Sequence, residues 1–232
     1  MKSVVTLLIA MIGLVAVTFA SPQTAPPAVG TDLYHVMFVK AAPGHASELA
    51  KALITPDKTA PMPDHYVVLR HQEGDDWDYV VVQHLGPKAE VVGTPSPQAV
   101  AARPLIAWHN DTFASGPGWG EFTKQMAGSG NPVYVVGVHR AIAGHREQLV
   151  SALNAPTGGS SKIETGNLLL SHVEGGDWNF LTLTRYNSWQ DLGSERATLA
   201  SAPSSTPGGW AEIRQHSASH RDTIADRIYP AK

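Results

Sequence analysis

The sequence predicts an α+β fold built from two copies of one β-α-β-β-α-β unit. Three matches between the halves predict it. Residues 34–53 align without a gap to residues 134–153, the phrase HQEGDDWDYVVV returns as HVEGGDWNFLTL, and HNDTF returns as HRDTI. Because the three blocks recur in the same order, a duplicated unit explains them better than coincidence does.

Each copy opens with a predicted strand and helix. Residues 33–40 and 133–140 are rich in β-branched and aromatic side chains, which favour strands. A Gly-His pair, at 44–45 and again at 144–145, then interrupts the chain before leucines that recur at helical spacing.

The repeated phrase is predicted to be a β-hairpin. The short aliphatic runs 65–71 and 167–172 meet second apolar runs, 77–85 and 178–186, across Glu-Gly-Asp-Asp or Glu-Gly-Gly-Asp. Glycine and aspartate accept the backbone conformations of tight turns, so we expect a turn with two strand ends.

Each copy is predicted to end with a helix and a last strand. In the second copy Ser188 can cap a helix, and Asp191 favours its first turn. The predicted inner face of this helix consists of Trp189, Leu192, Arg196 and Leu199. The first copy is shorter and rich in proline here, so its second helix should be short or broken. The His-x-Asp-Thr blocks supply the last strands.

The first twenty residues have the features of a secretory signal peptide. Lys2 precedes an uncharged apolar run, 4–17, and small residues stand before Ser21, as at a cleavage site. The run is short for a bilayer span, although an uncleaved anchor is the alternative. There is no cysteine, which excludes disulfides and a lipid-modified amino terminus. We expect an exported protein, periplasmic or extracellular in a bacterium.

The remaining chain divides at changes in composition. The predicted segments are a signal peptide 1–20, a Pro-rich leader 21–32, a first repeat 33–114, a Gly-rich linker 115–131 and a second repeat 132–229. The formal net charge is −3 with no basic block, so nucleic acid is not an expected partner. No later stretch is long and apolar enough for a membrane helix, and we expect the mature form not to be membrane-embedded. The oligomeric state stays open.

The start of each copy resembles a known superfamily. A strand ending in Lys or Arg, followed by APGHASELAKAL or IAGHREQLVSAL, resembles the first strand and helix of the dimeric α/β barrels, which include antibiotic-biosynthesis-type monooxygenases. The resemblance implies two ferredoxin-like repeats packed sheet to sheet, here as an intrachain barrel. The order of strands and helices that the resemblance implies covers nearly all of residues 33–228. The superfamily also holds haem-dependent enzymes and lactone isomerases, and no subfamily's catalytic signature transfers to this chain.

Strand alternation separates an apolar sheet face from a more mixed one. The mixed face is predicted to line the barrel lumen, because a ligand site needs a few polar groups on apolar walls. Its candidate ligand-binding residues are His35, His139, Gln83 and Thr184.

The His-x-Asp pairs are the sharpest chemical signal. His109 and Asp111, like His220 and Asp222, stand two apart on a strand and share a face. A carboxylate beside an imidazole orients its tautomer and raises its basicity, as a general base or metal ligand requires. The alternative is a hydrogen-bonded pair that only ties the last strand to its neighbour.

Two further histidines, His71 and His172, lie beside the hairpin turn. They can reach a pocket rim and bind a ligand, or bond the hairpin backbone and pack on Trp77 and Trp178.

Three functions are consistent with the sequence. The first is a small-molecule-binding protein or a cofactor-independent monooxygenase or isomerase, with a small hydrophobic or aromatic ligand between the sheets. The second is a non-catalytic structural or partner-binding protein. The third is a haem-binding protein, since one axial imidazole suffices. No metal site is predicted, because no His-x₃-His, His-Glu-x-x-His or Cys/His cluster occurs.

Overall fold

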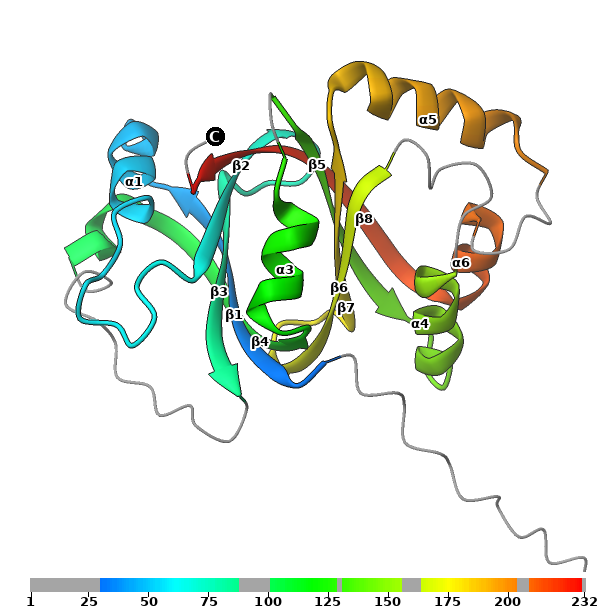
Figure 1. Cartoon of the computed structure of the whole chain (residues 1–232), viewed down its shortest axis with the longest axis horizontal. Helices are drawn as coiled ribbons and strands as arrows, with labels where there is room; N and C mark the ends of the chain where they lie inside the picture. Colours follow the sequence, from blue (N-terminus) through cyan, green and yellow to red (C-terminus); the bar gives the residue numbers. More distant parts are fainter. Residues whose placement is uncertain (1–29, 88–100, 129–130, 156–163, 204–208, 231–232) are drawn as a thin grey trace, which may run out of the picture.

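Eight antiparallel strands close into one barrel in the computed structural model (Figure 1). The structure describes residues 30–87, 101–128, 131–155, 164–203 and 209–230, so the predicted signal peptide and most of the leader lie outside it. The strands are β1 Asp32–Ala41, β2 Tyr66–Glu73, β3 Tyr79–Pro87, β4 Ile106–Gly116, β5 Val133–Ala141, β6 Glu164–Gly175, β7 Phe180–Tyr186 and β8 Ser217–Tyr229.

The two halves of the chain have corresponding strand orders. The order is β4-β1-β3-β2 in the first half and β8-β5-β7-β6 in the second. Pairing of β2 with β8, and of β4 with β6, joins the halves on both sides and closes the barrel. Both hairpins predicted from the repeated phrase are present, as β2–β3 and β6–β7.

Helices cover the outside of the strands and one end of the barrel (Figure 1). They are α1 Ala46–Leu53, η1 Arg103–Leu105, α3 Trp119–Met126, α4 Arg146–Asn154, α5 Trp189–Ser201 and α6 Trp210–His216. Most of the stretch where the first copy should have a broken second helix, residues 88–100, lies outside the described residues. Among the helices of the described residues, none is long and apolar enough to cross a membrane.

Helix α5 begins where the sequence predicts but buries another face. Ser188 Oγ accepts a hydrogen bond from the Asp191 backbone N–H, so the predicted cap is present. The buried side chains are Leu192 and Glu195, whereas Trp189 is 53% exposed. Glu195 is buried because its carboxylate accepts a hydrogen bond from the buried Tyr186 hydroxyl. Of the four residues predicted to share a face, only Leu192 is buried, and the polar Glu195 is buried beside it because its carboxylate has a hydrogen-bond partner.

The lumen is lined by the apolar sheet face, and the predicted assignment of the mixed face was wrong. The central core contains Tyr34, Val36 and Phe38 of β1 together with the corresponding side chains of β5. The mixed face lies on the outside, where Met37 and Val39 pack near α1. An eight-stranded barrel has an interior only wide enough for side chains to fill, so the most apolar face turns inward.

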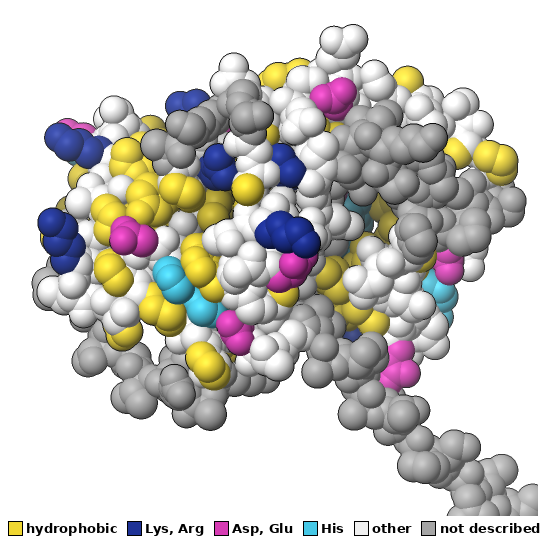
Figure 2. Space-filling model, in the orientation of Figure 1, with side chains coloured by type: hydrophobic (Ala, Val, Ile, Leu, Met, Phe, Trp, Pro, Cys, Tyr) yellow, Lys and Arg dark blue, Asp and Glu magenta, His cyan; other side chains and the backbone are white. Residues whose placement is uncertain are grey.

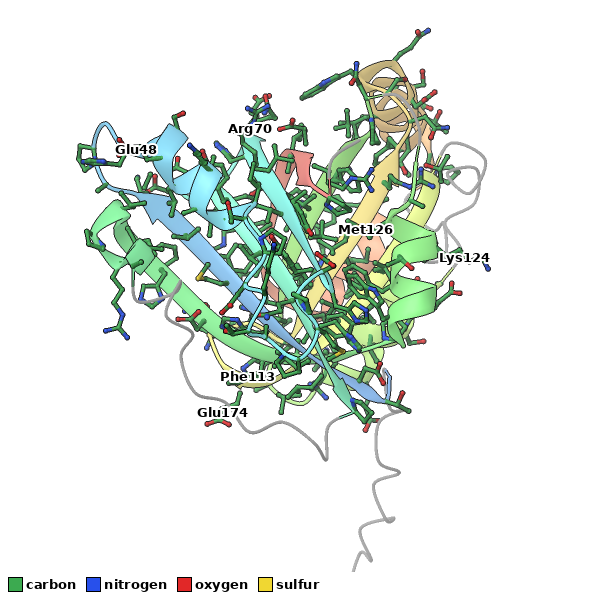
Figure 3. The ribbon with its side chains drawn as sticks, turned by 60° about the vertical axis from the view of Figure 1, so that its left-hand side comes forward. Glu48, Arg70, Phe113, Lys124, Met126 and Glu174 are labelled. Atoms are coloured by element: carbon green, nitrogen blue, oxygen red, sulfur yellow. The ribbon has the colours of Figure 1, made fainter. Side chains whose placement is uncertain are left out.

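Helix α3 lies within the segment predicted as a linker and closes one end of the lumen. Phe122 and Met126 are buried in the central core. Met126 points into the barrel and Lys124 away from it (Figure 3). Its last carbonyl oxygen, Met126 O, accepts from two buried donors, Tyr134 Oη at 3.0 Å and Arg227 Nη1 at 2.9 Å. These groups satisfy the unpaired end of a short helix, so α3 is part of the core.

The glycine of the repeated phrase is required by barrel closure. Gly74 (φ 128°) lies against β8, and Gly175 (φ 97°) lies against β4. A Cβ atom would stand 2.7 Å from Asp222 O at Gly74 and 2.4 Å from Asp111 O at Gly175. Each hairpin turn therefore contacts the last strand of the other half, which explains why the phrase occurs twice.

Candidate functional site

In both His-x-Asp pairs the imidazole and the carboxylate are in contact, but the pairs lie outside the lumen. His220 Nε2 is 2.8 Å from Asp222 Oδ1, and His109 Nδ1 is 2.6 Å from Asp111 Oδ2. Register places His220 opposite His139, on the helix-covered side of the second sheet. The residues share a face as predicted, yet that face is not the one that lines the lumen.

In the second half, a partly buried polar cluster surrounds His220. The His139 ring stacks on the His220 ring, with the ring centroids 4.6 Å apart. The ring of Trp210, in α6, also packs on His220, with a centroid distance of 4.5 Å. Arg196 of α5 reaches Asp222 Oδ2 at 3.4 Å. The cluster therefore combines side chains of β5, β8, α5 and α6.

His139 is a neutral imidazole held in one tautomer. It is 3% exposed, and burial, with a smaller contribution from the charge of His220, lowers its pKa from near 6.5 to about 3. Its Nε2 lies 2.9 Å from Thr182 Oγ1, and the Thr182 hydroxyl donates to Gly137 O. Nε2 must then carry the proton and donate. Nδ1 is buried with no hydrogen-bond partner among the described residues.

Asp222 stays ionised although it is largely covered. Burial alone would raise its pKa, but the contacts with His220 and the charge of Arg196 lower it overall. An ionised carboxylate accepts the Nε2–H of His220, which leaves Nδ1 as the basic nitrogen. The arrangement is chemically suited to a general base with its orienting carboxylate.

The first half has a different arrangement at the corresponding positions. Asp111 contacts two histidines, since His35 Nε2 lies 2.9 Å from its Oδ1 while His109 contacts Oδ2. The His35 hydrogen bond is the largest of the effects that lower the Asp111 pKa. His109 is 53% exposed, and Val39 stands opposite it where the second half has His139. The two halves of the chain therefore differ at this site.

The remaining predicted ligand-binding residues are dispersed. Gln83 lies opposite His35 on the outer face of the first sheet, and Thr184 lies opposite Val135 on that of the second. His71 and His172 pack edge-on against the ring of the tryptophan in their own hairpin, and His172 Nε2 lies 2.9 Å from Gly175 O. This is the alternative predicted for these two histidines.

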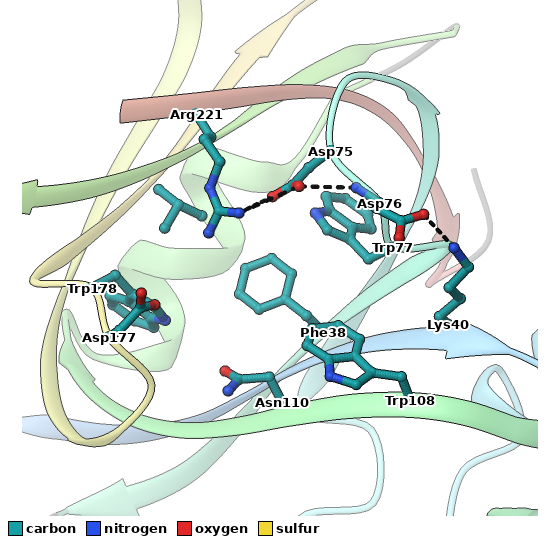
Figure 4. A pocket seen from close by; sticks show the side chains of 11 residues that line it. Phe38, Lys40, Asp75, Asp76, Trp77, Trp108, Asn110, Asp177, Trp178 and Arg221 are labelled. Atoms are coloured by element: carbon teal, nitrogen blue, oxygen red, sulfur yellow. Dashed lines mark hydrogen bonds and ion pairs between the residues drawn. The ribbon is translucent and has the colours of Figure 1, made fainter. Parts of the chain in front are cut away.

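A pocket of about 350 Å³ opens into the lumen at residues that the sequence analysis did not propose as ligand-binding (Figure 4). Its lining includes Asn110 and Arg221, the middle residues of the two His-x-Asp motifs. Strand alternation could have found them, because a residue between two outward side chains points inward. Both hairpin turns contribute as well, through Trp77 and Trp178.

Within the described residues, no group of three or more His, Asp or Glu side chains is arranged to hold a metal ion. The surface in Figure 2 intersperses acidic and basic side chains among apolar ones on the face it shows.

Sequence comparison finds no matching protein-family model and no matching curated protein. Structural comparison finds related folds. An anthrone oxidase-like protein superposes with a TM-score of 0.59 at 10% identity, over 87% of this chain and 93% of that one. A candidate monooxygenase from Fusobacterium nucleatum subsp. nucleatum gives 0.60 at 11%, over 86% and 93%. One from Lactobacillus acidophilus NCFM gives 0.50 at 10%, over 85% and 94%. The predicted dimeric α/β-barrel fold is confirmed.

Proposed function

We propose that this protein binds a small aromatic molecule and removes a proton from it at His220, in a cofactor-independent reaction of the monooxygenase or isomerase kind. The observation that carries the proposal is the Asp222–His220–His139 cluster. Asp222 Oδ1 lies 2.8 Å from Nε2 of His220, so Nδ1 is the nitrogen that would accept the substrate proton. The proposed reaction is therefore on the helix-covered face and not in the lumen.

The neighbours of His220 support this role. Proton uptake makes an imidazolium, which the ionised Asp222 stabilises at 2.8 Å. His139 remains neutral, so it stacks on the imidazolium without adding a like charge. Trp210 is 46% exposed and packs on His220, which offers an aromatic surface to a flat substrate.

The reaction balances without a resident cofactor. In an isomerisation, His220 returns the proton to another carbon of the substrate. In an oxidation, the carbanion is oxidised by dissolved O₂, and a CH₂ group becomes a carbonyl with release of one water. The name of one structural neighbour, an anthrone oxidase-like protein, favours a small aromatic substrate, and that of another, a candidate monooxygenase, favours the oxidative form.

The test compares matched variants of the two copies with anthrone as the probe. Deuterium exchange at its methylene carbon, followed by NMR, reports proton removal, and O₂ uptake reports oxidation. We expect His220→Gln to lower the protein-dependent rate about 10²-fold or more, and Asp222→Asn to lower it less. His109→Gln and Asp111→Asn should leave it unchanged.

Two results would contradict the proposal. Equal losses in the variants of the first and second copies would assign the His-x-Asp pairs to structure alone, which favours a non-catalytic protein. A Soret shift on adding haemin would favour the haem-binding alternative if one variant abolished both that shift and the activity.

We further propose that the chain is a tandem duplication of a ferredoxin-like unit and that it is exported. The corresponding strand orders and the three repeated sequence blocks support the duplication. The apolar run 4–17 supports export. Amino-terminal sequencing of the protein from a bacterial host should find Ser21 as the first residue, and an intact Met1 would contradict cleavage.

A further inference from the structure

The lumenal pocket lies at the end of the barrel away from α3. Along β1, the Tyr34 ring stacks on Phe122 of α3, whereas Phe38, four residues on, lines the pocket. Along β5, Tyr134 contacts Met126, whereas Val138 lines the pocket. Helix α3 therefore closes one end of the lumen, and the hairpin turns surround the other.

Aromatic rings form much of the pocket wall. The aromatic side chains that line it are Phe38, Trp77, Trp108 and Trp178 (Figure 4). Its volume of about 350 Å³ is within the range of small-molecule sites. An aromatic wall attracts either flat apolar groups or cations, so the charges at the rim decide between them.

The two basic side chains that line the pocket, Arg221 and Lys40, each form an ion pair with an aspartate of the first hairpin. Arg221 Nη1 lies 3.2 Å from Asp75 Oδ2, and Lys40 pairs with Asp76 (Figure 4). Asp75 Oδ1 also accepts the Asp76 backbone N–H at 2.9 Å. These contacts form one connected network, which leaves no net positive charge on this side.

The opposite side lacks such partners. Gly176 occupies the position that corresponds to Asp75, and Asn110 the position that corresponds to Arg221. Asp177 corresponds to Asp76 but has no ion pair among the described residues, and Arg140, the counterpart of Lys40, forms none with it. The pocket therefore carries one uncompensated carboxylate.

A buried donor on the same side also lacks a partner. Trp178 is 4% exposed, and its Nε1–H has no acceptor among the described residues. A buried N–H without an acceptor is costly, but this nitrogen is too covered for an atom in the pocket to reach, so it is not a ligand contact.

We propose that this pocket binds a small organic cation, a quaternary ammonium or protonated amine. The aromatic rings contact the cation, and Asp177 balances its charge. This site is independent of the proposed reaction at His220, because its residues lie on the opposite face of the strands.

The test measures binding of choline by isothermal titration calorimetry to the full mature chain. Choline offers a quaternary ammonium and a hydroxyl acceptor, and 3,3-dimethyl-1-butanol is its uncharged counterpart. We expect choline to bind at least about tenfold more tightly than the alcohol. Asp177→Asn should remove this preference, and Glu174→Gln, a variant of an exposed carboxylate in the same hairpin (Figure 3), should preserve it.

A second probe tests the charge alone. Tetramethylammonium carries the cation without the hydroxyl, so it should bind within a few-fold of choline and should also be weakened by Asp177→Asn. Thermal unfolding of each variant verifies that the barrel is intact. The proposal is overturned if choline and the alcohol bind equally, if neither binds, or if Asp177→Asn and Glu174→Gln have the same effect.

Discussion

Single positions along a strand decide which side of the barrel a side chain reaches. In β8, His220 and Asp222 face the helices, whereas Arg221 between them faces the lumen. The first half repeats this division with Asn110 as the inward residue. Because successive side chains point to opposite faces, one short motif supplies residues to two separate sites.

A buried neutral histidine makes the stability of this protein sensitive to acid. The pKa of His139 is about 3 in the folded state and near 6.5 when it is unfolded. Between these values the unfolded chain takes up a proton that the folded chain does not. The free energy of unfolding should therefore decrease as the pH is lowered from about 6.5 towards 3. This group contributes at most about 1.4 kcal/mol per pH unit to that decrease.

His139→Val tests this effect, because valine stands at the corresponding position 39. The variant should lose part of the decline in unfolding free energy between pH 6.5 and 4, measured by urea unfolding. His45→Gln, at an exposed helix start, is the control and should retain the full decline. An unchanged pH dependence in His139→Val would show that the imidazole is not held neutral.

At the scale of elements, the hairpin turns combine an unusual backbone with a close approach. Gly74 and Gly175 have positive φ and lie against the last strand of the other half. Gly44 also has positive φ, at 82°, but a Cβ there meets nothing within 4 Å. Alanine substitutions at these three glycines therefore distinguish the cost of backbone strain alone, at Gly44, from the cost of strain plus steric overlap, at Gly74 and Gly175.

We expect Gly44→Ala to lower the unfolding free energy by about 1–2 kcal/mol, from backbone strain alone. Gly74→Ala and Gly175→Ala should cost about 1–3 kcal/mol more, because the added methyl group overlaps a strand backbone. Denaturant unfolding of the three variants checks this order. Equal losses would mean that the turns adjust without disturbing the opposite strand.

At the scale of the whole molecule, the two halves depend on each other. The pairs β2–β8 and β4–β6 cross between them, and the lumenal core draws on both. A separated half would expose an apolar sheet face and two unpaired strand edges, which favours association.

We therefore expect that neither residues 30–128 nor residues 131–232 alone form a stable monomer. Light scattering after size exclusion should show self-association or unfolding for each, and their co-expression should restore a one-to-one complex. A soluble, folded monomer of either half, with protected amides in all its strands, would contradict the interdependence of the halves.

The order of elements was predictable because it depends on local patterns. The strands near 33–40 and 133–140, the hairpins and the Ser188 cap all follow from nearby residues. The His-x-Asp contacts were predictable for the same reason, since period-two spacing places both side chains on one face. Helix α3 was not, because its glycine-rich surroundings resemble a linker and its stability comes from burying Phe122 in a distant core.

The sequence by itself determined that two similar units follow one another, each with its strands, hairpin and last-strand pair in order. Only the tertiary structure decided which sheet face turned inward and which side chains met across the halves. The reason is physical: alternation defines two faces without ranking them, and the small interior of a closed barrel selects the more apolar one. That selection put His220 beneath the helices and Arg221 at the mouth of the lumen.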